Sequence, residues 1–465
     1  MLKLYNSFSN LLEEVELNKK EVKVYLCGPT VQSSPHLGHG RSAVVFDFLV
    51  RYLKYLEYKV TFVRNITDID DKIIEKSLEE NISYSELGTR VSIEFQNAYE
   101  KLNCIKPDSE PKATEFIDEI VKYIEILVEN KFAYVSKSGV YYDISKFDDY
   151  LLLSGRKKED VLSGTRVDIE EDKNSPEDFA LWKFSKENEP YWDSPWGSGR
   201  PGWHIECSSM IETILGKTID IHCGGNDLIF PHHENEIAQS KGAYPNEIFV
   251  KYWLHNGMLN LSGKKMSKSE GNIKLLNDYL DEFSGQVLRF FFLRSQYRSP
   301  QEFSLELLKE SESTLNNLIE FTKDVAPEPK DNKVLSIFTE SMNEDLNTAK
   351  MLGDLFKLIN DSASLEQEKL EDLKSSIKFV FNVLGFELTK KDTNKIGEEE
   401  LIEFFKKYDI KFENTNQAVK EFISKREGFR KIKDFDSADK MRDSILKIGI
   451  SLEDGTDSGW SWKTS

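Results

Sequence analysis

The sequence predicts an α/β fold, with a Rossmann-like, doubly wound parallel sheet in the first half of the chain and helical domains after it. Residues 22–26 and 59–64 are short apolar runs typical of buried strands, and residues 41–57 between them have the apolar spacing of a helix. Strands that alternate with helices pair in parallel, and the helices cover the faces of the sheet. The strand pattern returns at residues 218–222 and 248–254, where we expect the sheet to be completed.

The residues between these strands predict an insertion into the sheet domain. Capping residues at 67–71 predict a helix, and helical spacing continues over residues 83–130. Residues 133–144 have the pattern of a hairpin that turns at Ser138-Gly139. Residues 145–200 are charged and rich in loop-forming residues, so we expect little regular structure there.

The second half of the chain has an almost entirely helical pattern from about residue 300. Prolines and charged residues near 325–333 indicate a linker, and a polar stretch near 389–398 indicates a second break. We therefore expect a helical bundle followed by a small last domain.

Composition and charge limit the classes of protein to which the chain can belong. Its 465 residues are 39% hydrophobic and 31% charged, the composition of a soluble protein of several domains. No apolar run approaches ~18 residues, and residues 1–10 lack the pattern of a signal peptide. Four cysteines are too few for a disulfide framework, so we expect a cytoplasmic protein. The net charge of −19 argues against a protein that coats nucleic acid through general basicity.

His36 and His39 belong to a Pro-His-Leu-Gly-His-Gly motif that follows the first predicted strand. Three residues apart, they face the same way on one helical turn. The amino terminus of a helix at the end of a strand favours phosphate, and imidazoles there can donate hydrogen bonds to it. The alternative for these two residues is a helix cap or a surface position.

Lys265 and Lys268 belong to a Lys-Met-Ser-Lys-Ser motif in a loop bracketed by glycines. Their ammonium groups suit the β- and γ-phosphates of ATP, and the alternative is a solvated basic loop. The two motifs in this order predict ATP binding and attack on its α-phosphate. Asp227, after a predicted strand, is placed to hold a ribose hydroxyl, although a plain turn also explains it.

A metal site is the second candidate. His232 and Glu236 are four residues apart and share a helical face, and two thiols, Cys27 and Cys207, complete a set suited to tetrahedral Zn²⁺. The residues alone leave two alternatives open. Other residues could be the metal ligands, namely His222, Cys223, His233 and Glu234, or there is no metal and the pattern is a capped helix beside two buried thiols.

Two aromatic residues and one basic segment complete the candidates. Trp203 and Trp182 are candidates for pocket walls, although a core tryptophan is commoner. Residues 425–433 are basic with interleaved Phe and Ile, a pattern suited to an RNA surface or to the solvated face of an amphipathic helix.

These motifs together resemble the cysteinyl-tRNA synthetase family of class I aminoacyl-tRNA synthetases over essentially the whole chain. The resemblance rests on several motifs: CGPTVQSSPHLGHGR at 27–41, VRNITDIDDKI at 63–73, DFALWK at 178–183, GSGRPGWHIECSSM at 197–210, DIHCGGNDLIFPHHENEIAQS at 220–240, KMSKS at 265–269, YRSP at 297–300 and GISLEDG at 449–455.

The resemblance implies a role for each candidate residue. It assigns one Zn²⁺ per subunit to Cys27, Cys207, His232 and Glu236. It also implies that the catalytic and ATP-binding residues are His36, His39, Lys265 and Lys268, and that Asp227 binds ATP as well. Thr67, Trp203 and His222, together with Cys27, correspond to the residues that line the amino-acid pocket.

The resemblance also implies the reaction and the domains. We expect the enzyme to activate cysteine with ATP and Mg²⁺ and to transfer the activated cysteine to tRNA(Cys). We expect the bound zinc to exclude serine, so that no editing domain is needed, and the enzyme to be a monomer. The expected domains are a catalytic domain (1–110 and 200–260), a connective insertion (111–199), the KMSKS loop and stem-contact region (261–325), a helical bundle (326–395) and an anticodon-binding domain (396–465).

Two other functions remain open from the sequence. One is a related enzyme that ligates cysteine to an amino sugar, which the basic segment near the carboxyl terminus disfavours. The other is a non-catalytic RNA-binding relative, against which the intact ATP and metal motifs argue.

Overall fold

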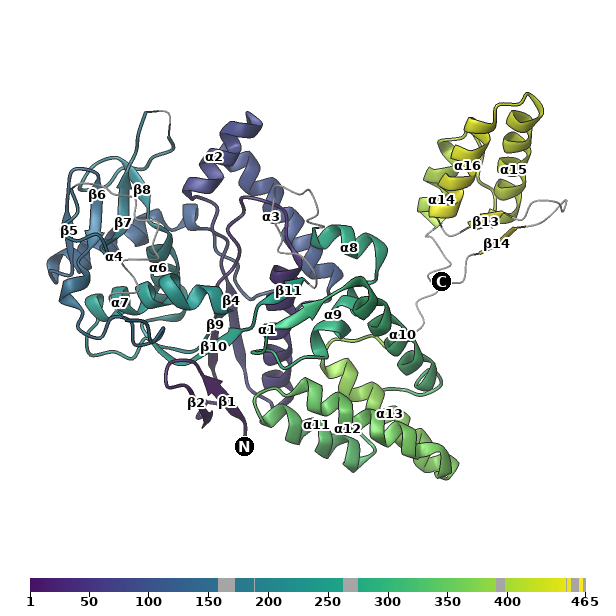
Figure 1. The fold of residues 1–465 in the computed structure, drawn as a ribbon, viewed down its shortest axis with the longest axis horizontal. Helices are drawn as coiled ribbons and strands as arrows, with labels where there is room; N and C mark the ends of the chain where they lie inside the picture. The colour runs from purple at the N-terminus through teal and green to yellow at the C-terminus, as the bar shows by residue number, and fades with distance from the viewer. Residues whose placement is uncertain are drawn as a thin grey trace. The chain divides into compact units, whose positions relative to one another are not determined.

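The predicted parallel sheet is present in the computed structural model and has four strands in the order β10-β9-β3-β4 (Figure 1). The strands are β3 (Val22–Leu26), β4 (Val60–Arg64), β9 (Ile219–Gly225) and β10 (Val250–Asn256). The structure describes residues 1–157, 172–187, 189–261, 275–389, 398–448, 450–452 and 460–462. From β3 the chain passes to β4 on one side, and β9 later pairs with β3 on the other. Ligands bind where the strand order reverses in this way, beyond the carboxyl ends of β3 and β9.

Helices cover both faces of the sheet, as expected for a doubly wound fold. Successive residues of β3 alternate between the two faces: Val24 belongs to the core beneath α1 (Leu37–Tyr55), and Tyr25 belongs to the core beneath α6 (Trp203–Leu215). Helix α1 begins at Leu37, earlier than the predicted residue 41, because His36 caps it.

The insertion forms an antiparallel sheet of its own, in the order β5-β6-β7-β8. The predicted hairpin is present, and the loop-rich stretch 145–200 contributes two short strands that were not predicted from the sequence. The sheet consists of β5 (Ala133–Val135), β6 (Gly139–Tyr142), β7 (Phe179–Phe184) and β8 (Gly199–Pro201). Its core includes Ile205 of α6 and Ala238 of α7 (Glu234–Ala243), so the insertion packs directly on helices of the catalytic sheet.

The continuous helical region predicted for 83–130 is two helices, α3 (Tyr84–Lys101) and α4 (Ile117–Glu129). Pro107 and Pro111 lie between them, and proline lacks the amide that a helix interior requires. This connecting segment runs parallel to β4, where Ser109 pairs with Val63. The predicted capping residues do start a helix, α2 (Asp71–Glu80), with Asp70 as the cap.

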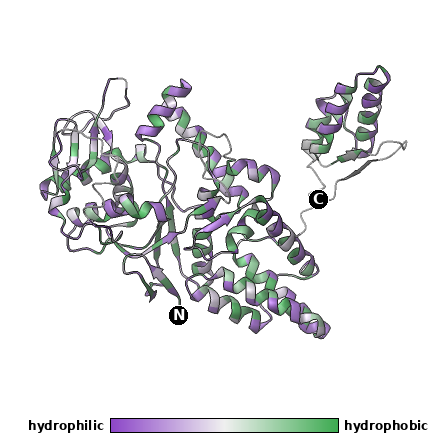
Figure 2. Ribbon diagram, in the orientation of Figure 1, coloured by the Kyte–Doolittle hydropathy of each residue, from purple (hydrophilic) through white to green (hydrophobic). Residues whose placement is uncertain are grey.

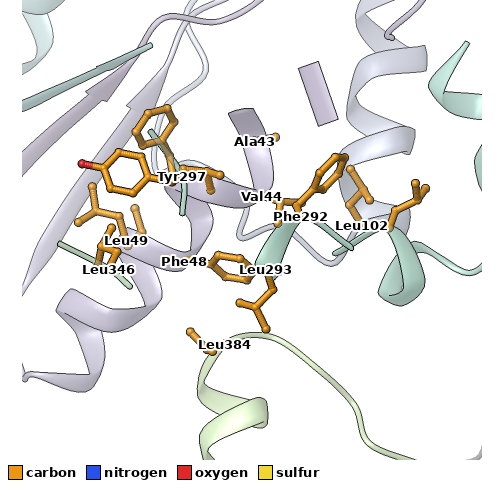
Figure 3. Close-up of a cluster of buried hydrophobic side chains, with 14 of the residues drawn as sticks. Ala43, Val44, Phe48, Leu49, Leu102, Phe292, Leu293, Tyr297, Leu346 and Leu384 are labelled. Carbon is orange, nitrogen blue, oxygen red and sulfur yellow. The ribbon is translucent and has the colours of Figure 1, made fainter. Parts of the chain in front are cut away.

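The helical second half of the first unit (Met1–Leu388) packs on α1. Val44 and Phe48 of α1 lie in one core with Phe292, Leu293 and Leu384 (Figure 3). The helices are α8 (Leu276–Glu282), α9 (Gly285–Leu293), α10 (Leu305–Phe321), α11 (Asn332–Asn343), α12 (Thr348–Asp361) and α13 (Gln367–Val383).

Two short sheets in the first unit were not predicted. Strands β1 (Lys3–Asn6) and β2 (Leu11–Glu14) form an amino-terminal hairpin. Strand β11 (Leu259–Leu261) pairs in parallel with β12 (Gln301–Phe303), and α8 and α9 lie between these two strands in the sequence.

The second unit (Thr389–Ser465) is a small helical domain with its own core, as the sequence predicts. It contains α14 (Glu398–Lys406), α15 (Thr415–Lys431), α16 (Phe435–Lys447) and the antiparallel strands β13 (Ile450–Leu452) and β14 (Trp460–Trp462). Within the basic segment, Arg426 is buried and Lys425 donates to the carbonyl of Asp409 at 3.2 Å. These two cations therefore serve the fold of this unit.

Polar and apolar residues share the same helices throughout the chain, as expected of helices with one buried side (Figure 2). Among the residues that the structure describes, no helix is both long and apolar enough to cross a membrane.

Candidate active site and metal centre

His36 and His39 form a reciprocal cap at the start of α1. The Nδ1 atom of His36 accepts a hydrogen bond from the Gly38 amide at 3.1 Å. The His36 amide in turn donates to Nδ1 of His39 at 3.2 Å, and the two rings stack with centroids 3.6 Å apart. The sequence offered a helix cap and phosphate binding as alternatives. The two roles are compatible, because the capping bonds use Nδ1 of each ring and leave Nε2 for a ligand.

The protonation of these imidazoles follows from their surroundings. Desolvation lowers the pKa of His36 and lowers that of His39 to about 3, so both rings are neutral at physiological pH. Since Nδ1 accepts in each ring, the proton sits on Nε2. Both rings therefore present an Nε2–H donor at the amino terminus of a 19-residue helix, where the helix dipole favours an anion.

Asp227 lies near the same helix end. It is exposed in the short helix η3 (Asn226–Leu228), directly after β9, and its charge raises the pKa of His36 against the larger lowering by desolvation. A carboxylate at this edge of the sheet suits a ribose hydroxyl. The other two predicted ATP ligands, Lys265 and Lys268, lie outside the described residues.

The four predicted metal ligands come together from four elements of the fold. Cys27 follows β3, Cys207 lies in α6, His232 lies in the short helix η4 (Ile229–His233), and Glu236 lies in α7. Their ligand atoms all lie within 4.8 Å of one another. The two sulfur atoms are 4.0 Å apart, and Nε2 of His232 is 3.0 Å from Oε1 of Glu236.

These separations fit a tetrahedral ion. Two thiolates on one zinc ion lie about 3.8 Å apart, and a nitrogen–oxygen pair lies about 3.3 Å apart, because Zn–S bonds are longer than Zn–N and Zn–O bonds. A set of two sulfurs, one imidazole and one carboxylate, all buried except for the partly buried Cys27, is also the chemistry that zinc prefers.

A second group shares two of these ligands. Cys27 and Glu236 also lie within reach of His222 and His233, with Nε2 of His233 at 3.3 Å from the Cys27 sulfur. The first group has two thiolates against one, so it remains our prediction for zinc. Cys223 and Glu234, the other two open candidates, belong to neither group. Cys223 is buried in the core beneath α1, and Glu234 accepts hydrogen bonds from the amides of Leu151 at 3.0 Å and Ser154 at 2.8 Å.

The charges of the cluster favour a cation. Burial opposes ionisation of Glu236, but the facing imidazoles of His222 and His232 outweigh it and lower its pKa to about 2. The contact with Cys27 lowers the pKa of Cys207 to about 6. Burial disfavours protonated His232, yet Glu236 and Cys207 outweigh it and raise its pKa to about 10. Without a metal, the cluster thus holds a proton on His232 that a bound metal would displace.

Two predicted amino-acid pocket residues, Trp203 and His222, contact residues of the metal cluster, and Thr67 contacts Glu206, which precedes Cys207 in the sequence. The Trp203 ring stacks on His232 with centroids 4.4 Å apart, and Nε2 of His222 donates to Oε2 of Glu236 at 2.8 Å. Thr67 donates to Oε2 of Glu206 at 3.0 Å. Trp182 is not part of this pocket, since it is fully buried in the core of the insertion.

The sequence did not single out four other residues here. Nδ1 of His204 lies 2.9 Å from Nδ1 of His232, and His255 lies 2.7 Å from Nδ1 of His233. Trp253 stacks on His222 with centroids 4.5 Å apart. Glu206 is fully buried, and burial raises its pKa well above the usual range. His204, His255 and Trp253 contact the rings that face the cluster, as outer partners of metal ligands do, whereas Glu206 bonds to Thr67.

Comparison with known proteins places this site in a family. Residues 13–313 match the family described as tRNA synthetases class I (C) catalytic domain, and residues 337–389 match the DALR domain. The chain is 43% identical to the cysteine–tRNA ligase of Thermodesulfovibrio yellowstonii, with 98% of each chain covered. It is 42% identical to that of Desulfotalea psychrophila, with 99% of each covered, and 42% identical to that of Pelagibacter ubique, with 99% of this chain and 98% of the other covered.

Solved structures of lower identity share the fold. The methionyl-tRNA synthetase of Mycobacterium tuberculosis in complex with methionyl-adenylate aligns with a TM-score of 0.58 at 16% identity, over 78% of this chain and 89% of that one. A putative arginyl-tRNA synthetase from Campylobacter jejuni aligns with a TM-score of 0.53 at 16% identity, over 81% of this chain and 95% of the other.

Proposed function

Since the chain belongs to the cysteine–tRNA ligase family of class I aminoacyl-tRNA synthetases, we propose that this site activates cysteine with ATP and passes it to tRNA(Cys). The observation that carries the proposal is the meeting of two groups at one edge of the sheet. Imidazole donors stand at the amino terminus of α1, and a cluster of soft ligands joins the end of β3 to α6 and α7. The first group suits the phosphates of ATP, and the second suits a thiol.

The chemistry needs no nucleophile from the protein. A carboxylate oxygen of cysteine attacks the α-phosphorus of ATP, the bond to the bridging oxygen breaks, and pyrophosphate leaves. A hydroxyl of the terminal tRNA ribose then attacks the carbonyl carbon, and AMP leaves. The Nε2–H groups of His36 and His39 stabilise the charge that develops on the α-phosphate, while Lys265, Lys268 and Asp227 hold the rest of ATP.

The metal cluster is the proposed basis of selection against serine. Cys27, Cys207, His232 and Glu236 would hold one Zn²⁺, which accepts a thiolate far more readily than a hydroxyl. Thr67, Trp203 and His222 border the same place and fix the position of the amino acid. Shape alone separates such near-isosteres by only about 10²-fold, so selection by the metal makes an editing domain unnecessary.

Several expectations extend the proposal to the whole protein. We expect a cytoplasmic monomer that uses Mg²⁺ with ATP. The domain boundaries given above also stand as proposals, with the stem of tRNA(Cys) at residues 261–325 and its anticodon at residues 396–465.

Charging of tRNA tests the proposed function. The protein, ATP and labelled cysteine are incubated with total tRNA, and we expect label in tRNA that ribonuclease and mild alkali release. Label absent from tRNA, with cysteine-dependent pyrophosphate exchange intact, would instead indicate ligation to a small molecule. Absence of both reactions from zinc-loaded protein would contradict the proposal.

A further inference from the structure

Arg41 is a buried cation on α1 whose guanidinium group binds only main-chain carbonyls among the contacts that the structure gives it. The residue is fully buried, in the turn of α1 that follows His36 and His39. Its Nη1 atom donates to the carbonyls of Gly257 and Met258, both at 2.8 Å. Its Nη2 atom donates to the carbonyls of Tyr297 at 3.3 Å and Ser299 at 2.6 Å.

This arrangement joins two strands that are remote in sequence. Gly257 and Met258 immediately precede β11, and Ser299 precedes its partner β12. The two segments lie so close that a Cβ atom at Gly257 would come within 2.4 Å of the Ser299 carbonyl oxygen. Burying a guanidinium without an opposing carboxylate is costly, and here Nε also lacks a hydrogen-bond partner. What the four bonds do provide is a fixed position of the two main-chain segments relative to α1.

A second contact fixes α1 to the chain beyond residue 274. The amide of Leu276, at the start of α8, donates to the carbonyl of Pro35 at 2.8 Å. The Leu276 side chain is fully buried against Gly40, where a Cβ atom would come within 3.1 Å of it. The described chain on both sides of residues 262–274 is therefore attached to the first turns of α1.

We propose that Arg41 is a positioning residue for ATP: it holds the strand that leads to Lys265 and Lys268 in register with the helix end that carries His36 and His39. The inference rests on the proposed ATP-binding role of these four residues. Arg41 does not touch the ATP site in this role and acts through the main chain of Gly257 and Met258. Misplacement of catalytic groups by about 1 Å can cost up to about 10²-fold in rate, so the register of the two elements matters.

Arg289 offers a matched control within the same unit. It is also fully buried, and it donates to the carbonyls of Leu384 at 2.8 Å and Leu102 at 3.1 Å while pairing with Asp47. It joins α9 to Asp47 of α1, to Leu102 at the end of α3 and to Leu384 at the end of α13. Its guanidinium group bonds to none of the carbonyls that Arg41 binds, so its replacement perturbs a buried guanidinium at a different set of contacts.

The experiment compares Arg41→Lys and Arg289→Lys with the unchanged protein in cysteine-dependent pyrophosphate exchange. Lysine keeps the charge but cannot bind four carbonyls in a fork. For Arg41→Lys we expect the KM for ATP to rise at least about 10-fold with a lower kcat, while the KM for cysteine changes by less than about twofold. Arg289→Lys should lower the thermal unfolding temperature without this rise in the KM for ATP.

If Arg41→Lys is not recovered as folded protein, Gly257→Ala perturbs the same junction and should give the same ATP-specific effect.

Two results would overturn the inference: an unchanged KM for ATP in folded Arg41→Lys or Gly257→Ala, or an equal rise in Arg289→Lys. Failure of the unchanged protein to exchange pyrophosphate would be a separate result, against the proposed function itself.

Discussion

Cys207→Ala should lose bound zinc and lower the kcat/KM for cysteine activation by more than about 10²-fold, since even the outer partners of metal ligands contribute about 10- to 100-fold. The Cys207 sulfur lies 4.0 Å from that of Cys27, and its pKa of about 6 makes it the more readily ionised thiol of the pair. Its removal leaves three ligands and an incomplete tetrahedral set. Zinc content by elemental analysis and pyrophosphate exchange with cysteine measure the two effects.

Cys223→Ala is the matched control for this prediction. Cys223 is equally buried and lies next to His222, but it belongs to neither group of candidate ligands. We expect the Cys223→Ala variant to keep one zinc per chain and most of its activity. Zinc content that is normal in the Cys207 variant and reduced in the Cys223 variant would contradict the proposed ligand set.

His39→Ala should lower the rate of adenylate formation by about 10²- to 10³-fold, the usual cost of removing one preorganised donor. The ring is a neutral Nε2–H donor, and the variant loses both this donor and the cap on the His36 amide. His39→Asn keeps a side-chain amide donor and should recover part of the rate. Single-turnover formation of cysteinyl-adenylate measures the step.

The pH dependence separates this role from that of a charged histidine. Because desolvation lowers the pKa of His39 to about 3, the ring is already neutral well above that value. The ratio of the rates of the unchanged protein and His39→Ala should therefore stay constant between about pH 6 and pH 8, the range in which an ordinary histidine would lose its proton. A ratio that falls as the pH rises through this range would show that the protonated ring is the active form.

The catalytic sheet was predictable because its signals are local. The runs that form β3, β4, β9 and β10 each contain several apolar residues, as buried strands do, although Lys23, Asp220 and Lys251 occupy the second positions of β3, β9 and β10. Strands β7 and β8 carry Lys183 and Arg200, and these side chains find their partner only in the folded protein, where both bind Asp71 at 2.5 Å. A charged residue in a short strand with a distant partner gives no strand pattern in the sequence.

The candidate site also contains contacts that the sequence predicts and contacts that it does not. The shared face of His232 and Glu236, the proposed ligand pair, was predictable from helical spacing, and in the structure Nε2 of His232 lies 3.0 Å from Oε1 of Glu236. Contacts of Glu206, His204, His255 and Arg41 were not predictable, since each joins elements far apart in the chain. Arg41, for example, contacts residues more than two hundred positions away, and no periodic pattern encodes such a contact.

The most direct test of the account is pyrophosphate exchange with cysteine and with serine in parallel, for zinc-loaded and chelator-treated protein. We expect the zinc-loaded protein to prefer cysteine by more than about 10³-fold in kcat/KM, beyond the roughly 10²-fold that shape can supply. Removal of zinc should abolish exchange with cysteine, and restored zinc should return it. A preference of only about 10²-fold that is unchanged by removal of zinc would contradict the claim that the cluster selects the thiol.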